Sequence, residues 1–422
     1  MLCLKNGRCI DPKTEKDEIL DILIDGDQII ALGKDLSAEQ IIDMTGYIVT
    51  PGFIDSHVHL REPGYTYKED IRSGALAGAK GGFTSILALA NTNPVIDTCE
   101  ILDDVLNKMK ECPINVYSAA AVSVGFQGQE CVDMEKLKQH GALCFSDDGL
   151  PLIDRTFTKQ CLIKAKELDM PVSFHEEDPQ YISLSGINEG VISEQLGIGG
   201  ASAKAEDVMV KRDCELALET GAKVCFQHIS SKVAIEYIRQ AKAKGANIWA
   251  EATPHHFSLN EEAILKHHTL AKMNPPLRTE EDRLAIIEGL KDGTIEVIAS
   301  DHAPHTMEEK QREFKKAPSG IIGLETSLSL GIMNLVHTHQ LSMMDYLAKM
   351  NYNVAKCYNL PTASIEVGNL ADITVFSENE TWTPTSFISK SQNSPFLNQP
   401  LTGKVKLTIC KGRIVYQDDS IC

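Results

Sequence analysis

The sequence predicts an α/β protein: a (β/α)8 TIM barrel that carries a small β-sandwich domain formed by both chain ends. Two patterns in the 422 residues indicate this fold. Between residues 51 and 361, short apolar runs alternate with helical stretches, which is typical of a parallel sheet covered by helices. Residues 1–50 and 362–422 instead have short strand-like runs and turn residues. We therefore expect the barrel, residues 51–361, to be inserted between two parts of the β domain.

Residues 1–50 are expected to form short strands joined by turns. The apolar runs 21–24 and 28–31 flank a DGD tripeptide, and Asp-Gly between such runs favours a hairpin. Strand-like runs return near the other end of the chain, at 372–376, 404–409 and 412–416. We expect these later runs to pair with the N-terminal strands.

The barrel strands are predicted from eight short apolar runs that are separated by helical patterns. These runs are 52–56, 84–90, 115–121, 142–146, 171–174, 223–227, 247–252 and 296–299. Helical patterns between them include 97–111, 155–168, 206–220, 232–244 and 280–290. Eight strands in alternation with helices favour a closed parallel barrel.

Polar side chains follow the ends of these predicted strands. In a barrel of this class, the active site lies at the carboxyl ends of the strands. A random scatter of structural histidines would not follow the strand ends in this way. The residues concerned are His57, His59, Asn91, Asp147, Asp148, His175, His228, His255, His256 and Asp301.

Composition excludes several classes of function. A net charge of −18 argues against nucleic-acid binding, which needs a basic surface. The first 20 residues lack the apolar region of a signal peptide, and no apolar run reaches membrane-spanning length. Twelve cysteines without C-x-x-C pairs fit reduced thiols. We expect a cytoplasmic protein that binds neither nucleic acid nor a membrane.

The segment 55–61, with the sequence DSHVHLR, suggests a metal site beside an anion site. Side chains two apart on a strand share a face, so His57 and His59 can hold one ion. Arg61 suits a carboxylate. Imidazole and carboxylate groups are the usual donors to catalytic zinc. Five residues qualify as metal ligands, namely His57, His59, His175, His228 and Asp301. This number exceeds the needs of one ion and favours two ions with a bridging carboxylate, which Asp147 or Asp148 could supply.

Each candidate also has a structural interpretation. His175 and His228, taken singly, could be buried structural histidines, and Asp147 could cap the segment that follows it. Asp301 has the strongest context, since the run SDHAPH at 300–305 places an acid and two imidazoles at the end of the last strand. The pair His255-His256 follows a strand, but nothing requires it to contact the site.

Several motifs together resemble one family closely. The chain is similar to dihydroorotases of the longer bacterial type, within the amidohydrolase superfamily, over essentially its whole length. The motifs that carry the resemblance are PGFIDSHVHLR at 51–61, NT at 91–92, SDDG at 146–149, KMNPPLR at 272–278, SDHAPH at 300–305 and GIIGLE at 320–325.

The resemblance implies a role for each metal ligand. His57, His59 and Asp301 resemble the ligands of a first zinc ion, and His175 and His228 those of a second. Asp148 resembles the bridging carboxylate; it is preferred to Asp147 because its 27-residue separation from His175 matches the family. The site is therefore expected to hold one or two Zn2+ ions, with two favoured.

The resemblance also implies a substrate and a reaction. The reaction is the reversible hydrolysis of the cyclic amide of (S)-dihydroorotate to N-carbamoyl-L-aspartate in pyrimidine biosynthesis, with Asp301 as the catalytic acid and base. Arg61, Asn91 and His305 are expected to hold the substrate carboxylate. Ser319 stands where relatives carry an aromatic residue. The implied substrate-binding residues are His59, Leu60, Arg61, Asn91, Asn274, His305, Ser319 and Gly320.

Two alternatives are weighed beside this interpretation. Hydantoinases and allantoinases share the His-x-His motif but use a carboxylated lysine on the fourth strand, and residues 142–148 contain no lysine. Some dihydroorotase-like chains are inactive scaffolds that assemble with aspartate carbamoyltransferase, but such chains have lost metal ligands. The family also suggests a homodimer, and an association with that carbamoyltransferase stays open.

A charged run lies between residues 306 and 318, directly after His305. It favours a solvated surface loop or short helix. The functional alternative is a mobile lid beside His305.

Overall fold

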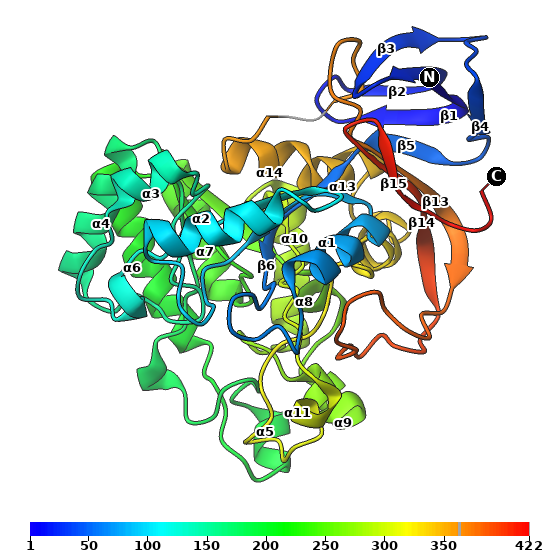
Figure 1. Cartoon of the computed structure of the whole chain (residues 1–422). Coiled ribbons are helices and arrows are strands. Elements are labelled where there is room, and N and C mark those ends of the chain that lie inside the picture. The colour runs from blue at the N-terminus through cyan, green and yellow to red at the C-terminus, as the bar shows by residue number, and fades with distance from the viewer. Residues whose placement is uncertain (362–363, 422) are drawn as a thin grey trace.

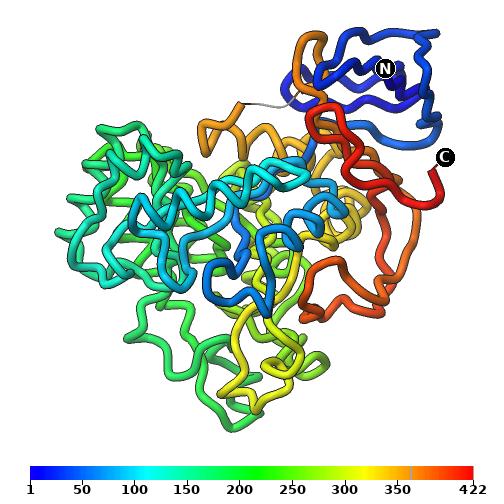
Figure 2. Tube along the Cα trace, viewed as in Figure 1, coloured from blue at the N-terminus to red at the C-terminus, as the bar shows by residue number. Residues whose placement is uncertain are grey.

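The computed structural model describes residues 1–361 and 364–421, and it consists of a helix-covered barrel beside a smaller sheet (Figure 1). The two chain termini both lie at the smaller sheet (Figure 2). The predicted domain boundary at residue 362 lies outside the described residues, so the three domain ranges stay predictions.

Parallel strands form the barrel wall in two sheets. Phe145 joins the sheets through parallel bridges to Ala120 and Val172, and a bridge between Val58 and His302 closes the ring. One sheet contains β6 (Phe53–Val58), β7 (Phe83–Ala88) and β8 (Asn115–Ser118); the other contains β9 (Val172–Phe174), β10 (Val224–Phe226), β11 (Ile248–Ala252) and β12 (Val297–Ile298).

The fourth predicted strand is the weakest of the eight. Residues 142–146 are not one continuous strand by their bridge pattern, but they bond to both neighbours: Leu143 N donates to Ser118 O at 2.9 Å, Ser146 N to Ala120 O at 2.9 Å and Phe145 N to Pro171 O at 3.1 Å. The other predicted barrel strands are all found at their expected places in the chain.

Helices cover the barrel, and polar residues define where they begin. Thr98, Asp154, Ser231 and Thr279 each accept a hydrogen bond from an amide of the following first turn, which stabilises the helix start. The covering helices are α1 (Ile71–Lys80), α2 (Cys99–Met109), α3 (Met134–His140), α4 (Arg155–Glu167), α6 (Lys204–Thr220), α7 (Lys232–Ala243), α10 (Glu280–Asp292), α12 (Ser327–Gly331), α13 (Met343–Met350) and α14 (Tyr352–Cys357).

Shorter helices lie in the loops around the barrel. They are α5 (Val191–Gln195), α8 (Pro254–Ser258), α9 (Ala263–His267) and α11 (Met307–Lys310), with further single turns at Val124–Phe126, Pro179–Tyr181, His268–Ala271 and Ile332–Val336. In Figure 1, α5, α9 and α11 lie together on the side of the barrel away from the small sheet.

The small sheet unites the two ends of the chain, as predicted. Strand β5 pairs in parallel with β1 and antiparallel with β13, so N-terminal and C-terminal strands share one hydrogen-bonded network. The predicted hairpin is confirmed by the pairing of Asp25 with Gln28. The strands are β1 (Leu2–Asp11), β2 (Lys16–Asp25), β3 (Gln28–Gly33), β4 (Gln40–Asp43), β5 (Ile48–Pro51), β13 (Ile373–Trp382), β14 (Leu401–Cys410) and β15 (Arg413–Gln417).

The barrel interior is filled by small and apolar side chains that the strands direct inward. Tyr358, directly after α14, donates a hydrogen bond from its hydroxyl to Glu251 inside the barrel at 3.0 Å. Interior residues from the strands include Ile54, Leu87, Ala119, Cys144, Cys225 and Val297.

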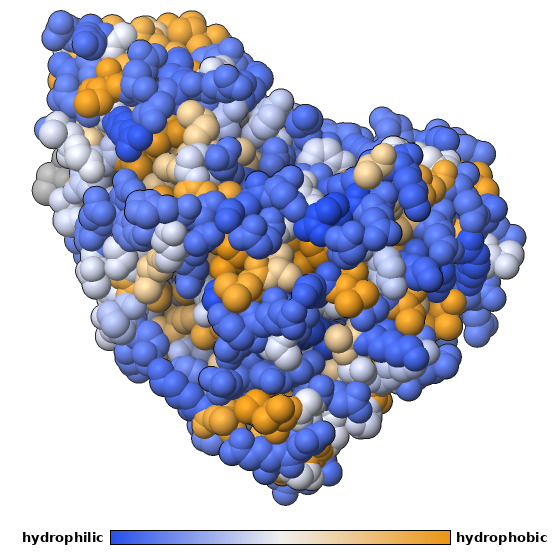
Figure 3. All heavy atoms as spheres, turned by 180° about the vertical axis from the view of Figure 1, so that it is seen from behind, coloured by the Kyte–Doolittle hydropathy of each residue, from blue (hydrophilic) through white to orange (hydrophobic). Residues whose placement is uncertain are grey.

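On the face seen in Figure 3, apolar side chains form separate patches among hydrophilic ones. None of the helices within the described ranges has the length and apolar character needed to cross a bilayer.

Candidate metal centre and substrate pocket

The predicted metal ligands converge at one end of the barrel. His57 lies in β6, and His59 follows that strand; His175, His228 and Asp301 follow β9, β10 and β12. All five side chains are buried. Since the carboxyl ends of parallel strands meet at one rim, residues that are far apart in sequence become neighbours here.

A first group of ligand atoms surrounds Asp301. Its Oδ1 lies 3.0 Å from His59 Nε2 and 3.5 Å from His57 Nε2. These three residues form one of the two clusters whose ligand atoms all lie within 4.8 Å of one another.

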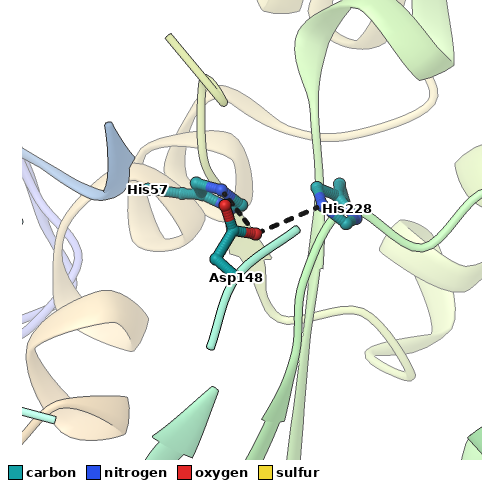
Figure 4. Close-up of side chains that lie close together, drawn as sticks. All are labelled: His57, Asp148 and His228. Atoms are coloured by element: carbon teal, nitrogen blue, oxygen red, sulfur yellow. Dashed lines mark ion pairs between the residues drawn. The ribbon is translucent and has the colours of Figure 1, made fainter. Parts of the chain in front are cut away.

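A second group of ligand atoms surrounds Asp148. Its Oδ1 lies 3.5 Å from His57 Nε2, 3.8 Å from His175 Nδ1 and 3.9 Å from His228 Nε2. Its Oδ2 lies 3.6 Å from His59 Nε2. In Figure 4 the Asp148 carboxylate lies between the rings of His57 and His228. One carboxylate therefore contacts all four histidines.

Asp147 faces away from this cluster. It accepts hydrogen bonds from the amides of Val122 and Ser123 and from the Ser123 hydroxyl. Burial raises the pKa of Asp147 to about 6. Its side chain supports the loop after β8, so the geometry favours Asp148 for the bridging position, although this role stays a prediction.

The donor set fits a divalent metal ion. Ligand atoms around a tetrahedral zinc ion, with bonds of about 2.0–2.2 Å, lie roughly 3.4 Å apart, which is close to the spacings above. Among the described residues, His57 Nε2 and Asp148 Oδ1 are buried without a hydrogen-bond partner. Buried polar atoms are rarely left unpaired, and a cation between these two atoms would satisfy both.

The electrostatics of the cluster also suit a cation. Burial would lower the pKa of His57, but the carboxylates of Asp148 and Asp301 outweigh it and hold that pKa well above its ordinary value. Burial would raise the pKa of Asp148, but the surrounding histidines, led by His57, hold it well below its usual range. Burial and the neighbouring His175 and His57 lower the pKa of His228.

Three of the four histidines are oriented by a polar partner on the other ring nitrogen. His57 Nδ1 lies 3.4 Å from Glu251, His59 Nδ1 lies 2.9 Å from Asn91 Oδ1, and His175 Nε2 lies 3.0 Å from Glu177. Such partners fix the tautomer and the ring orientation of metal ligands. Sequence reasoning missed both glutamates, although a buried acid within an apolar strand and an acid two residues after His175 were visible signals.

The predicted substrate-binding residues surround a pocket of about 200 Å3 next to these ligands. Leu60 is the exception: its buried side chain lies against Gly74 of α1, where a Cβ would come within 2.3 Å of Leu60 Cδ2. His255 and His256 do not line the pocket either. The lining residues are His59, Arg61, Asn91, Asp148, Gly149, His175, His228, Asn274, Asp301, Ala303, His305, Ser319 and Gly320.

Hydrogen-bond donors converge on one wall of the pocket. Arg61 Nε donates to Pro304 O at 3.1 Å, and Arg61 Nη2 lies 3.2 Å from His305 Nε2. Lys68 Nζ lies 3.3 Å from His305 Nδ1. Burial, followed by the charges of Arg61 and Lys68, holds the pKa of His305 well below its ordinary value. A neutral imidazole can accept only one hydrogen bond, so this wall has an excess of donors and favours an anion.

Loops form a further part of the pocket lining. Asn274 Oδ1 is buried without a hydrogen-bond partner among the described residues and belongs to the pocket lining. Gly320 has a φ of +123°, a backbone conformation that L side chains rarely adopt. Its amide donates to Lys272 O at 2.9 Å. These contacts hold the Ser319–Gly320 backbone at the edge of the pocket.

The charged run 306–318 is not simply a solvated segment. Lys310 is 1% exposed, and its ammonium donates to the carbonyls of Lys272, Pro318 and Gly320 at 2.9–3.2 Å. The interpretation of the run as solvated was therefore wrong for Lys310. Part of the run does form the short helix α11, and the mobile-lid interpretation stays a prediction.

Comparisons with known proteins agree with this geometry. The model of the Amidohydrolase family matches residues 48–415. Among solved structures, the L-hydantoinase (dihydropyrimidinase) from Arthrobacter aurescens superposes with a TM-score of 0.88 at 23% identity, covering 100% of this chain and 97% of that one. The D-hydantoinase from Thermus sp. gives a TM-score of 0.86 at 23% identity, with coverages of 100% and 96%. These likenesses confirm the predicted barrel fold.

Curated sequence relatives are much more similar to this chain than these solved structures are. Proteins named dihydroorotase are 57% identical in Clostridioides difficile (strain 630), 51% in Clostridium acetobutylicum and 47% in Lactococcus lactis subsp. lactis. Each comparison covers 99% of this chain and 99–100% of the relative. The chain therefore belongs to the amidohydrolase family and, within it, to the dihydroorotases.

Proposed function

We propose that the chain catalyses the reversible hydrolysis of L-dihydroorotate to N-carbamoyl-L-aspartate, a step of pyrimidine biosynthesis. The observation that carries the proposal is the juxtaposition, in one pocket, of a two-centred ligand set and a donor-rich anion wall. Amide hydrolysis needs the metal ligands, and the binding of a substrate with a free carboxylate needs the donor-rich wall. The full-length identity to proteins named dihydroorotase supports the same reaction.

The metal site is proposed to hold two Zn2+ ions. His57, His59 and Asp301 would hold one, His175 and His228 the other, and Asp148 both. When bound, such ions lower the pKa of water and polarise an amide carbonyl. Zinc is chosen because imidazole and carboxylate are its usual donors at catalytic sites. The cytoplasmic location, the homodimer and an association with aspartate carbamoyltransferase stay predictions.

The chain's own residues supply proton transfer and orientation. Asp301 lines the pocket at the ligand cluster, where its carboxylate would take a proton from water and deliver it to the leaving amide nitrogen. Arg61 and His305 would bind the substrate carboxylate from one wall. Asn91, which contacts both His59 and Asp148, would link the carboxylate to the ligand cluster. Fixed in this way, the amide carbonyl meets the attacking water in one orientation.

A substrate panel tests the proposal. The zinc-loaded protein is incubated separately with L-dihydroorotate, hydantoin and allantoin, and ring opening is followed for each. We expect dihydroorotate to be opened and the two carboxylate-free rings to react far more slowly. A preference for hydantoin or allantoin would identify another cyclic amidohydrolase, and inactivity on all three would favour a scaffold.

A further inference from the structure

The connection between β13 and β14, residues 383–400, extends from the small sheet along the barrel; it is the orange-red segment below β14 in Figures 1 and 2. Contacts to the loop before α1 fix it there. Ser391 donates to Lys68 O at 2.7 Å, Lys390 Nζ donates to Thr66 O at 3.0 Å, and the Ser389 hydroxyl donates to Glu69. A segment of the small domain therefore lies against the loop that carries Lys68, one of the donors at the anion wall.

Within this connection, Asn393 bonds to the backbone of residues that line the substrate pocket. Its side chain is fully buried, at 0% exposure. Asn393 Oδ1 accepts a hydrogen bond from the amide of His305 at 3.1 Å. Asn393 Nδ2 donates to the carbonyls of Ala303 at 3.0 Å and Gly320 at 3.1 Å. The side chain thus makes three of the four hydrogen bonds that a carboxamide can make, which fixes its orientation.

The residues that Asn393 holds belong to two different loops. His305 and Ala303 follow the last barrel strand, whereas Gly320 lies beyond the charged run. The two loops are close: a Cβ at Gly320 would lie 2.7 Å from the Ala303 Cβ and 3.4 Å from His305 Cδ2. The two loops are joined directly by the bond from Ala303 N to Ile321 O at 2.7 Å, and the Asn393 carboxamide adds a second link, which reaches His305 and Gly320 themselves. The main-chain carbonyl of Asn393 also accepts a hydrogen bond from Ile322 N at 3.1 Å.

We propose that Asn393 is a positioning residue for substrate binding, which it controls by holding His305 and Gly320 at the correct separation. This inference rests on the proposed function. It also means that the connection between two strands of the small sheet helps to position residues that line the pocket of the barrel. Gly320 O retains a bond from Lys310 Nζ at 3.0 Å without Asn393. The His305 amide has no such second hydrogen-bond partner in the described structure, so loss of the Asn393 side chain should displace His305 more than Gly320.

Saturation kinetics on three variants test the proposal. Asn393→Ala removes all three side-chain bonds. Asn393→Asp keeps the shape and the acceptor for His305 but lacks the amide donors. The matched control is Gln392→Ala, because the Gln392 side chain, among the described residues, bonds only to Phe387 and Ser389 of the same connection. KM and kcat for dihydroorotate, the metal content per chain and the thermal unfolding midpoint are measured for each protein.

We expect Asn393→Ala to raise KM about tenfold, the equivalent of one or two lost hydrogen bonds, with kcat and metal content nearly unchanged. Asn393→Asp should lie between the wild type and Asn393→Ala, and Gln392→Ala should match the wild type. If Asn393→Ala does not fold, the test rests on Asn393→Asp, and a rise in its KM above threefold supports the proposal.

Three outcomes would overturn this role. They are a KM within threefold of the wild type, an equal rise in Gln392→Ala, or a loss of kcat that follows a loss of metal. A wild-type protein that does not open dihydroorotate would instead overturn the proposed function itself. The two failures are therefore distinguishable.

Discussion

The two sides of the pocket are built in different ways. The metal side, defined as the four histidines with Asp148 and Asp301, lies on or directly after barrel strands and is oriented by buried groups of the barrel, such as Glu251 and Glu177. The anion side, defined as Arg61, His305 and Gly320, lies in loops. Lys68, Lys310 and Asn393 hold it, and all three come from other segments.

This difference predicts that substitutions on the two sides of the pocket impair different steps. Damage to the metal side should reduce metal affinity and turnover, because the chemistry takes place there. Damage to the anion side should weaken substrate binding and leave the bound metal in place. The following substitutions test this separation, beginning with the largest expected effect.

Replacing Asp301 with Asn should reduce kcat at least a thousandfold. The change removes the proton acceptor, whose contribution is typically 10²–10⁴-fold, and also weakens a metal bond. Stopped assays with concentrated enzyme measure the residual rate, and metal analysis of the same sample separates the two causes. Turnover near the wild-type rate would refute the role of Asp301.

Replacing Glu177 with Gln should weaken metal binding about 10–100-fold, as is typical for the loss of a partner that orients a metal ligand. Glu177 lies 3.0 Å from His175 Nε2, and the other nitrogen of that ring faces His228 at 2.9 Å. Competition with a chelator measures the affinity. Asp178→Asn is the control, because Asp178 bonds to the amide of Gln180; equal affinities in the two variants would contradict the prediction.

Replacing Lys310 with Met should raise KM only a few-fold, because Gly320 keeps its bond from Asn393 when the ammonium is lost. The thermal unfolding midpoint should fall as well, since the carbonyls of Lys272, Pro318 and Gly320 each lose one hydrogen bond from the buried ammonium. Lys316→Met, an exposed position in the same charged run, is the control. A KM and a midpoint both equal to those of the control would show that Lys310 does not support the anion side.

The metal side was largely predictable from the sequence, and the supports of the anion side were not. Strand ends of a barrel converge by geometry, so alternation and the positions of His175, His228 and Asp301 were sufficient to expect a cluster. Asn393 carries no local pattern, and its partners lie 88 and 73 residues away. Lys310 was hidden in a charged run, because local composition does not reveal that one lysine of the run is buried.

Arg61→Met tests the separation of the two sides most directly. Kinetics and bound metal are measured on one preparation, beside Arg72→Met as an exposed control on α1. Loss of a charge-assisted hydrogen bond predicts a rise in KM of about 10–100-fold, with the number of metal ions per chain equal to that of the wild type. An unchanged KM, or a loss of metal together with the loss of binding, would contradict the account.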